Sequence, residues 1–398
     1  MRVGIDAWDL SRDLHFTGMG QYSRHLLVSL PDAGRDVSVV AYGSPYDSRP
    51  SWLPQQLAWR SVGRRMPAKL TALHSRLLAL PQVVARDGVD LFHATAVHMR
   101  PYFPPVPRLD CPVVVTLHDL IPLTHYRVSS LPMRQQLFYR WNLRRAVRAD
   151  GVITVSEHSR SEIVSVLGVE RDRVHVIHNG VEFPANHDRG VLTRLQLDRP
   201  YLLYAGSFEP RKNLARALRA FRLLVDHGHP HVLAAVVERR SGHQPEVMAE
   251  LARLGLGERV RLLHSLEEAD LRSLYTHAEL LFFPSLAEGF GYPPVQAGAV
   301  GLPVVASDLP VLREIMGEAP VYVDPYSEEA MATGLAMVLG DKGLRLRMTE
   351  LGRNAAARFT HERCARGHLE VYDRVLRESA SSRIARRKQG IESPRVEV

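Results

Sequence analysis

Two adjacent cations, Arg211 and Lys212, come directly before a predicted amphipathic helix in the segment GSFEPRKN. The positive end of a helix disfavours cations, so the pair makes sense if an anion lies between these side chains and the free backbone N–H groups. A diphosphate has the charge and the oxygen acceptors for such a place. The alternative is a pair of cations that faces solvent.

A lone carboxylate, Glu288, lies in the turn Glu288-Gly289-Phe290-Gly291. The apolar run 280–283 before it predicts a buried parallel strand, and a helix of small residues, 294–300, follows it. A strand, a glycine turn and a helix in this order present free N–H groups at the carboxyl edge of a sheet, where open α/β sheets bind anionic nucleotides. One carboxylate beside an anion site suits a sugar hydroxyl or a developing cation.

Two features of the N-terminal half could meet the same ligand. Gly18 and Gly20 open a helix in TGMGQY, either as a tight turn or to let backbone N–H groups approach a diphosphate or sugar. The third glycine of the dinucleotide fingerprint G-x-G-x-x-G is missing, with Ser23 in its place. His118 follows the strand-like run 112–117, at the edge where parallel strands line a ligand crevice. With 19 histidines in the chain, it could also be an ordinary hydrogen-bonded polar residue.

Strands that alternate with helices must position these residues. Strand-like runs are found at 2–6, 37–42, 90–93, 112–117, 151–155, 174–177, 201–206, 231–237, 260–263, 280–284, 303–306 and 321–323. The alternation predicts parallel, doubly wound sheets. Because 398 residues exceed one compact core, we expect an α/β protein with two Rossmann-like domains, residues 1–184 and 200–360, facing across a cleft. A helix with an apolar stripe follows at 361–378, and residues 379–398 read as a disordered basic tail.

Composition limits the partners and the compartment. The net charge of +8 favours phosphate-bearing substrates or an anionic membrane surface, whereas no block of like charge or RNA-binding motif predicts a nucleic-acid partner. Only two cysteines occur, which fits a reducing cytoplasm. Asp6 and Asp9 interrupt any signal peptide, and no window reaches the roughly 18 apolar residues of a membrane span. We expect a cytoplasmic protein, soluble or peripheral at a membrane.

The segment 45–81 has a different composition, in which proline, tryptophan and arginine are mixed. One interpretation is a solvated variable loop. The other is an acceptor-binding or membrane-surface element. The second interpretation rests on basic and apolar residues close together, namely Arg60, Arg64, Arg65, Lys69 and Arg76 beside Trp52, Leu53, Leu57 and Trp59.

Three segments taken together, TGMGQY, GSFEPRKN and EGFGYPPVQAGAVGLPVVASD, resemble the retaining glycosyltransferases of family 4. The resemblance extends to about residue 375 and implies the two-domain GT-B architecture. It further implies a nucleotide-sugar donor bound mainly by the second domain and an acceptor bound mainly by the first. The active site of the family needs no metal or other cofactor, and the last helix crosses back to the first domain.

The resemblance assigns roles to single positions of this chain. Arg211 and Lys212 match the diphosphate-binding cations, and Glu288 matches the first glutamate of the E-x7-E pattern beside the donor sugar. Phe290 and Gly291 match the turn whose amides contact that sugar. His118 matches a histidine at the reaction centre, so that His118 and Glu288 are the expected catalytic residues. Gly18 and Gly20 match the glycine loop of the first domain.

The chain departs from the family pattern twice. The second glutamate, which accepts hydrogen bonds from the ribose hydroxyls, is Gln296 here; the lost charge assistance is worth roughly 1 kcal/mol. An arginine that often follows the glycine of the first strand is Ser207, which leaves more of the diphosphate charge to Arg211 and Lys212.

The resemblance implies transfer of a hexose with retention of configuration, to a saccharide, glycolipid or natural-product hydroxyl. GDP-mannose is the first candidate donor, because the HDLIPL run and the glycine loop look like those of mannosyltransferases, and UDP-sugars come second. A degenerate GT-B protein that binds sugar nucleotide without transferring it remains an alternative because of Gln296. An epimerase or a dinucleotide oxidoreductase on two α/β domains is another.

Overall fold

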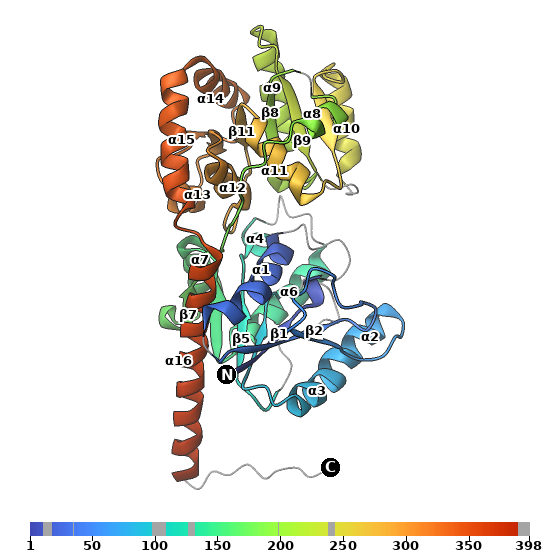
Figure 1. Ribbon diagram of the computed structural model, residues 1–398, viewed down its shortest axis with the longest axis vertical. Coiled ribbons are helices and arrows are strands. Elements are labelled where there is room, and N and C mark those ends of the chain that lie inside the picture. Colours follow the sequence, from blue (N-terminus) through green and yellow to red (C-terminus); the bar gives the residue numbers. More distant parts are fainter. Residues whose placement is uncertain are drawn as a thin grey trace.

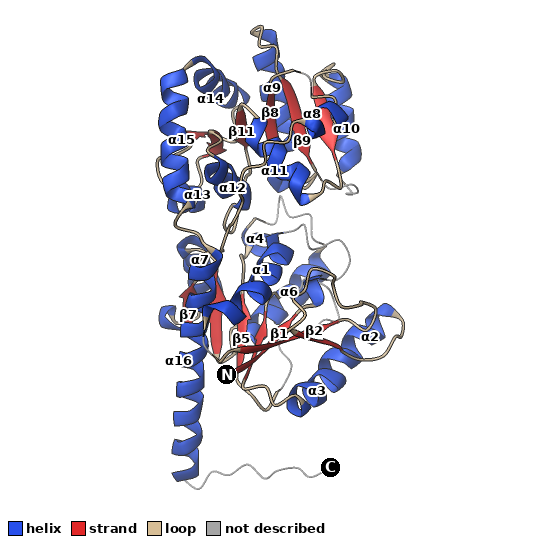
Figure 2. Ribbon diagram, viewed as in Figure 1, coloured by secondary structure: helices blue, strands red, loops and turns tan. Residues whose placement is uncertain are grey.

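The chain forms two α/β domains, described from a computed structural model in which residues 1–10, 18–34, 36–97, 109–125, 132–197, 199–237 and 243–388 are described. Their strands make one seven-stranded and one six-stranded sheet, and all strand pairs are parallel. Helices cover both sheets (Figures 1 and 2). The expected pair of Rossmann-like parallel-sheet domains is therefore confirmed.

The first sheet has the strand order β3-β2-β1-β4-β5-β6-β7. Its strands are β1 (Arg2–Asp6), β2 (Ser38–Gly43), β3 (Ala58–Ser61), β4 (Leu91–Ala94), β5 (Val113–Thr116), β6 (Gly151–Thr154) and β7 (Val174–Val176). The central strands β4 and β5 are buried along their whole length, because helices cover both faces of the sheet. The short helices η1 (Trp8–Leu10) and η4 (Arg171–Arg173) lie in connections.

The helices of the first domain divide between the two faces of this sheet. Tyr22 of α1 (Gly18–Ala33) packs in one core cluster with Tyr372 of α16 (His361–Lys388). The opposite cluster contains Val84 and Tyr139. The second face is therefore covered by α3 (Leu80–Arg86), which continues α2 (Ala68–His74) and the π-helix η3 (Ser75–Ala79), and by α6 (Met133–Ala146). The remaining helices are α4 (Ile121–Thr124) and α7 (Glu157–Leu167).

The second sheet has the order β10-β9-β8-β11-β12-β13. Its strands are β8 (Tyr201–Ala205), β9 (Val232–Val236), β10 (Val260–Leu263), β11 (Leu280–Phe283), β12 (Val304–Ser307) and β13 (Val321–Val323). The helices around it are α8 (Gly190–Arg194), η5 (Pro210–Lys212), α9 (Leu214–Asp226), α10 (Gln244–Arg253), α11 (Glu268–His277), α12 (Tyr292–Val300), α13 (Pro310–Met316), α14 (Glu328–Gly340) and α15 (Lys342–Ala356). β8 and β11 are neighbours at its centre, which brings the loops after them together.

The long helix α16 returns from the second domain and runs along the first (Figure 1). Its apolar stripe, including Val371, Tyr372 and Val375, is buried against α1 and the first sheet, as the sequence predicted. The predicted start of the disordered tail at residue 379 is wrong, because α16 extends to Lys388. No proline or glycine occurs between residues 368 and 389, and basic side chains favour the end of a helix. Residues 389–398 lie outside the described residues.

The segment 45–81 corrects another expectation. Residues 58–61 form the edge strand β3, which the apolar periodicity did not reveal. Leu53 and Leu57 are buried in the core of the first domain, with Trp52 and Trp59 packed against it. Leu53 and Leu57 are therefore core residues rather than part of a surface element, and Trp52 and Trp59 are partly buried.

Candidate functional site

The predicted cations and carboxylate meet at the carboxyl edge of the second sheet. Lys212 donates from Nζ to Oε1 of Glu288 at 2.6 Å, and Nη1 of Arg211 lies 3.7 Å from Oε2 of the same carboxylate. Arg211 also donates from Nε to Glu209 at 2.7 Å. The side chains of Lys212 and Glu288 are only 12% and 9% exposed. Three residues separated by up to 77 positions in sequence thus form one compact charged cluster.

Local backbone geometry explains how these loops are fixed. Asn213 follows the cations in a left-handed conformation, with φ of 60°, and its side-chain amide donates to the carbonyls of Pro284 and Pro325. The N–H of Leu286 donates to the carbonyl of Arg211 at 2.7 Å. These bonds tie the loop after β8 to the loop after β11. The cations and Glu288 are therefore held in register by one main-chain hydrogen bond and by the side chain of Asn213.

The charged groups of the cluster shift one another's pKa values. Burial alone would raise the pKa of Glu288, but Lys212 and Arg211 outweigh it and hold that pKa below the usual value. Burial lowers the pKa of Lys212, and Glu288 opposes this only in part. The pKa of Arg211 is raised, because the carboxylates of Glu288 and Glu209 outweigh its burial. The cluster therefore keeps an ionised carboxylate, and its cations are close enough to share an incoming anion.

The first domain contributes His118 and Asp119 to the same site. Gly289, in the turn after Glu288, lies so close to them that an added Cβ would be 2.9 Å from the carbonyl oxygen of His118 and 3.0 Å from the carboxylate of Asp119. Burial raises the pKa of Asp119, while Arg211 and Lys212 oppose the rise and Glu288 adds to it. Asp119 thus feels all three charges of the second domain. Sequence reasoning noticed it as the neighbour of His118 but gave it no role.

Thr95 and Tyr22 of the first domain hold the imidazole of His118 in place. Its Nε2 donates to the carbonyl of Thr95 at 2.9 Å, and its ring meets the ring of Tyr22 edge to face, with centroids 4.8 Å apart. The carbonyl of His118 accepts a hydrogen bond from Ser159. Both its ring and its backbone are therefore held in place at the domain interface.

A buried hydrogen-bond chain lies beneath His118. Because the Cys364 carbonyl can only accept, Nδ1 of His368 donates to it at 2.7 Å, and Nε2 then accepts from the hydroxyl of Tyr22 at 2.6 Å. Thr116 bonds that hydroxyl at 2.7 Å and is 2.8 Å from Nε2 of His93. Nδ1 of His93 completes the chain with the hydroxyl of Tyr372 at 2.6 Å. Through His368 and Tyr372, α16 is joined to the floor of the site.

The other predicted residues also lie at or near the interface. Gly18 is the first residue of α1, and a Cβ there would be 3.5 Å from the ring of Tyr292 in the second domain. Gly20 is buried in the first turn of α1. Gly291 has φ of 94° and precedes α12, so the turn needs glycine at this place. The side chain of Phe290 is buried against Tyr292 and Phe359, which leaves its backbone as the part that could meet a sugar.

Gln296 lies in the middle of α12, 8% exposed. The structure thus brings Arg211, Lys212, Glu288 and the His118–Asp119 pair together, with Gly18 facing the start of α12.

Glu314 joins the two domains in a way that sequence reasoning missed. Its carboxylate, on α13, accepts from the backbone N–H groups of Glu157 and His158 at 2.7 and 3.0 Å and lies 2.9 Å from Nε2 of His178. Burial would raise the pKa of Glu314, but these hydrogen bonds prevail and lower it. The carboxylate thus caps the positive end of α7. No local signal could reveal it, because its partners are more than 130 residues away in sequence.

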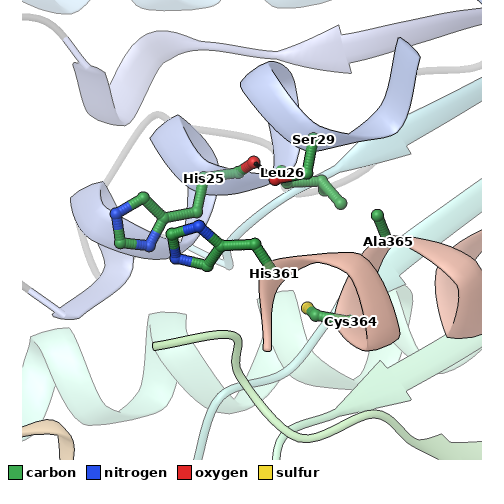
Figure 3. A pocket seen from close by; sticks show the side chains of 6 residues that line it. All are labelled: His25, Leu26, Ser29, His361, Cys364 and Ala365. Atoms are coloured by element: carbon green, nitrogen blue, oxygen red, sulfur yellow. Dashed lines mark hydrogen bonds between the residues drawn. The ribbon is translucent and has the colours of Figure 1, made fainter. Parts of the chain in front are cut away.

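A small cavity lies elsewhere, between α1 and the start of α16 (Figure 3). His25 and His361 face each other at its edge, with ring centroids 4.0 Å apart, and burial followed by the charge of His361 lowers the pKa of His25 to about 3. Its space of about 10 Å³ holds about one water molecule. The cavity is therefore a packing gap and too small for a sugar.

Comparison with known proteins gives consistent matches. Residues 16–183 match the family model described as Glycosyltransferase Family 4, and residues 193–355 match the model described as Glycosyl transferases group 1. The O-antigen chain mannosyltransferase B of Escherichia coli is 31% identical over 231 residues, which are 56% of this chain and 60% of that protein. The chain thus matches less than two thirds of the length of that relative.

The O-antigen chain mannosyltransferase RfbU of Salmonella typhimurium is 28% identical over 327 residues, covering 80% of this chain and 86% of that protein. Among solved structures, Anabaena Alr3699/HepE in complex with UDP-glucose has a TM-score of 0.69 at 17% identity, covering 96% of this chain and 100% of that one. This is a likeness of fold, and the fold is GT-B, as the sequence predicted. Within the described residues, no helix is both long and apolar enough to cross a membrane.

Proposed function

Because the chain belongs to family 4 of the retaining glycosyltransferases, which use nucleotide sugars, we propose that it transfers mannose from GDP-mannose to a hydroxyl of a saccharide, glycolipid or small natural product. The observation that carries the proposal is the buried Glu288–Lys212–Arg211 cluster, which faces His118 and Asp119 across the domain interface. The names of the two mannosyltransferase relatives support mannose as the sugar. A UDP-sugar is the second candidate donor.

In this proposal the two domains divide the work. Residues 200–360 form the donor domain, where Arg211 and Lys212 bind the diphosphate and Glu288 accepts hydrogen bonds from the sugar hydroxyls. The amides of Phe290 and Gly291 contact the same sugar, and Gln296 binds the ribose hydroxyls. Residues 1–184 form the acceptor domain, in which His118 orients the donor sugar and Gly18 and Gly20 let the backbone approach it. We place the reaction in the cytoplasm.

The proposed chemistry is a front-face displacement. The bond between the anomeric carbon and the phosphate oxygen breaks as the acceptor oxygen forms its bond to the same carbon, on the same face. The acceptor proton goes to the departing phosphate oxygen. The anomeric carbon gains positive charge while the phosphate gains negative charge, and Arg211 and Lys212 stabilise the latter.

Nucleotide screening followed by a transfer assay tests the proposal. We expect GDP to raise the melting temperature more than UDP, because a ligand that binds only the folded chain stabilises it. A radiolabelled GDP-mannose should then give labelled acceptor, and the Glu288→Gln variant should lose transfer while it still binds GDP. A larger shift with UDP would move the proposal to UDP-sugars. Absence of both a nucleotide shift and transfer would refute it.

The second candidate function is sugar-nucleotide binding without transfer, which Gln296 favours as the replacement of the family's second glutamate. The same assay separates the two. Donor binding with neither transfer nor hydrolysis, across a panel of acceptors, would support the degenerate protein.

A further inference from the structure

Exposed apolar side chains gather on one face of the first domain. Among the described residues, fifteen large apolar side chains are exposed, and seven of these belong to α2, η3 and α6. On α6, Met133, Leu137 and Trp141 are spaced four residues apart and are 75%, 61% and 47% exposed, so they form one stripe along the helix. A second stripe on α2 and η3 consists of Leu70, Leu73, Leu77 and Leu78.

The two stripes lie on the same side of the first sheet. Val84, on the helix that continues η3, and Tyr139 and Leu143 of α6 pack in one core cluster against Phe92 of β4. The buried sides of both helices thus rest on the same sheet face. Their other sides, which carry the stripes, turn away from the sheet. We call the exposed surface of α2, η3 and α6 the basic apolar face.

The segments that carry this face are rich in cations. Residues 62–86 and 120–149, which contain its helices, hold eleven Lys and Arg and no Asp or Glu. One of the eleven, Arg76, is buried and paired with Asp6, so it adds nothing to the charge of the face. The rest of the chain then holds 40 Lys and Arg against 43 Asp and Glu, so these two segments account for the positive charge of the whole protein. Arg134, Arg140 and Arg144 are exposed beside the α6 stripe, and the guanidinium of Arg145 lies 4.9 Å from the centre of the Trp141 ring.

The exposed apolar side chains and the positive charge together indicate which kind of partner binds this face. A second copy of the chain would place one positive face against another, which costs energy. A nucleic acid would match the arginines but offers no apolar layer for seven exposed side chains. An anionic lipid bilayer offers both phosphates and an acyl boundary into which leucine and tryptophan insert.

We propose that the basic apolar face docks on the surface of an anionic lipid bilayer, with its leucines and Trp141 in the headgroup–acyl boundary and its arginines at the lipid phosphates. The sequence pointed to a membrane-surface element in residues 45–81 through Trp52, Leu53, Leu57 and Trp59, but the two leucines are buried in the core and the two tryptophans are partly buried against it. The exposed side chains belong instead to residues 70–78 and to α6. The docking is independent of the donor chemistry.

Vesicle sedimentation of the full chain tests this proposal. We expect at least tenfold stronger binding to phosphatidylcholine vesicles that contain 30% phosphatidylglycerol than to phosphatidylcholine alone, with a steep loss in 0.5 M NaCl. The double variant Leu137→Gln/Trp141→Gln should lose at least tenfold in the partition coefficient. The matched control is Met337→Gln/Leu346→Gln in the second domain, because these residues are 48% and 63% exposed against 47% and 61% for the test pair. The control should bind as the unmodified chain does.

Two further measurements distinguish docking on a lipid bilayer from an interface between copies of the chain. Trp141 fluorescence should shift to the blue with anionic vesicles, and the shift should disappear in Trp141→Phe while the other three tryptophans remain. Failure of the unmodified chain to bind anionic vesicles, or equal binding by the Leu137→Gln/Trp141→Gln variant, would overturn the proposal. Concentration-dependent dimers that this variant abolishes, without vesicle binding, would overturn it in favour of an interface between copies. Because no donor is needed, these outcomes are independent of the transferase assay.

Discussion

Lys212 illustrates how much one side chain does in the charged cluster. Its ammonium is nearly buried and bonds Glu288 at 2.6 Å, whereas Arg211 is 3.7 Å from the same carboxylate and shares its charge with Glu209. A diphosphate that enters the cluster would meet Lys212 already oriented by Glu288. Orientation before binding reduces the entropy lost on binding, so Lys212 should contribute strongly to donor affinity.

Replacing Lys212 should therefore weaken nucleotide binding. In Lys212→Met we expect at least a tenfold loss of affinity for the nucleoside diphosphate, because one charge-assisted bond disappears. Titration calorimetry measures the loss. The control is Arg222→Met on α9, which removes a cation paired with the exposed Asp226. Equal affinity of the two variants would remove Lys212 from the donor site.

A substitution at Gln296 should strengthen nucleotide binding instead of weakening it. A glutamate at this position would restore the carboxylate that the family pattern has eight residues after Glu288. If the ribose hydroxyls bind here, Gln296→Glu should tighten nucleotide binding roughly fivefold, the equivalent of about 1 kcal/mol. The same calorimetric titration measures it, and a deoxyribose nucleotide should show no gain. A gain that is equal for both nucleotides would contradict the assignment to the ribose.

At the scale of elements, α16 contributes buried polar side chains to the first domain as well as apolar ones. It supplies His368 and Tyr372 to a buried hydrogen-bond chain, and Tyr22 within this chain packs against the ring of His118. Burial lowers the pKa of His368 to about 4, and that of His93 well below the ordinary value. The chain therefore docks α16 through uncharged histidines.

These histidines predict a loss of stability in acid. The pKa of His368 is about 6.5 in the unfolded chain and about 4 in the folded one, so the unfolded state binds more protons as the pH falls below 6.5. From pH 7.5 to pH 5 this one group should lower the free energy of unfolding by about 2 kcal/mol. Urea unfolding at the two pH values measures the difference. His368→Gln should show a smaller difference, and an unchanged one would exclude His368 as the cause.

Some elements could be predicted from the sequence and others could not. Asn213 and Gly291 adopt positive φ at the starts of α9 and α12, and both helices were expected from their sequence patterns. Strand β3 was not, because three half-buried residues and one exposed residue at a sheet edge make no apolar run. The end of α16 was placed too early because a polar, basic sequence can remain helical without a core to bury.

At the scale of the whole molecule, the site exists only because the domains touch. Gly289 approaches the His118–Asp119 peptide closely, and its carbonyl accepts a hydrogen bond from Ser156 at 2.8 Å. Glu314 joins α13 to the N-terminus of α7 nearby. Glycine at one contact and a carboxylate at the other thus set the separation of the domains.

A methyl group at position 289 should push the domains apart. In Gly289→Ala the added Cβ would meet the backbone of His118 at 2.9 Å, so we expect at least a tenfold loss of transfer while each domain stays folded. Transfer rate and circular dichroism measure the two effects. Gly257→Ala is the matched control, because a Cβ there meets nothing within 4 Å. Full activity of Gly289→Ala would mean that this close approach is not needed.

Loss of the carboxylate at Glu314 should loosen the same interface. Glu314→Gln removes the charge that caps α7, a contribution of about 1 kcal/mol, and should increase the radius of gyration measured by X-ray scattering. Because the pKa of Glu314 is lowered in the folded chain, this contribution is present above pH 4.5 and lost as the pH falls below it. Glu318→Gln, exposed just after α13, should change neither quantity. Equal scattering of both variants at neutral pH would mean that Glu314 does not hold the two domains together.

The sequence by itself determined the kinds of element and the chemistry they carry. Apolar runs such as 280–283, glycine turns and paired cations are local signals, because strand, turn and anion-binding geometry each depend on neighbouring residues. They were enough for two parallel-sheet domains and for most of the charged cluster.

Only the tertiary structure decided which distant side chains meet. Tyr22 bonds His368 across 346 residues and Glu314 caps a helix more than 150 residues away, and no local periodicity specifies such pairs. Sheet order and domain contact decide them, since these determine which element ends lie at one edge. The same packing buried Leu53 and Leu57 and left Leu137 and Trp141 exposed, which a count of apolar residues cannot distinguish.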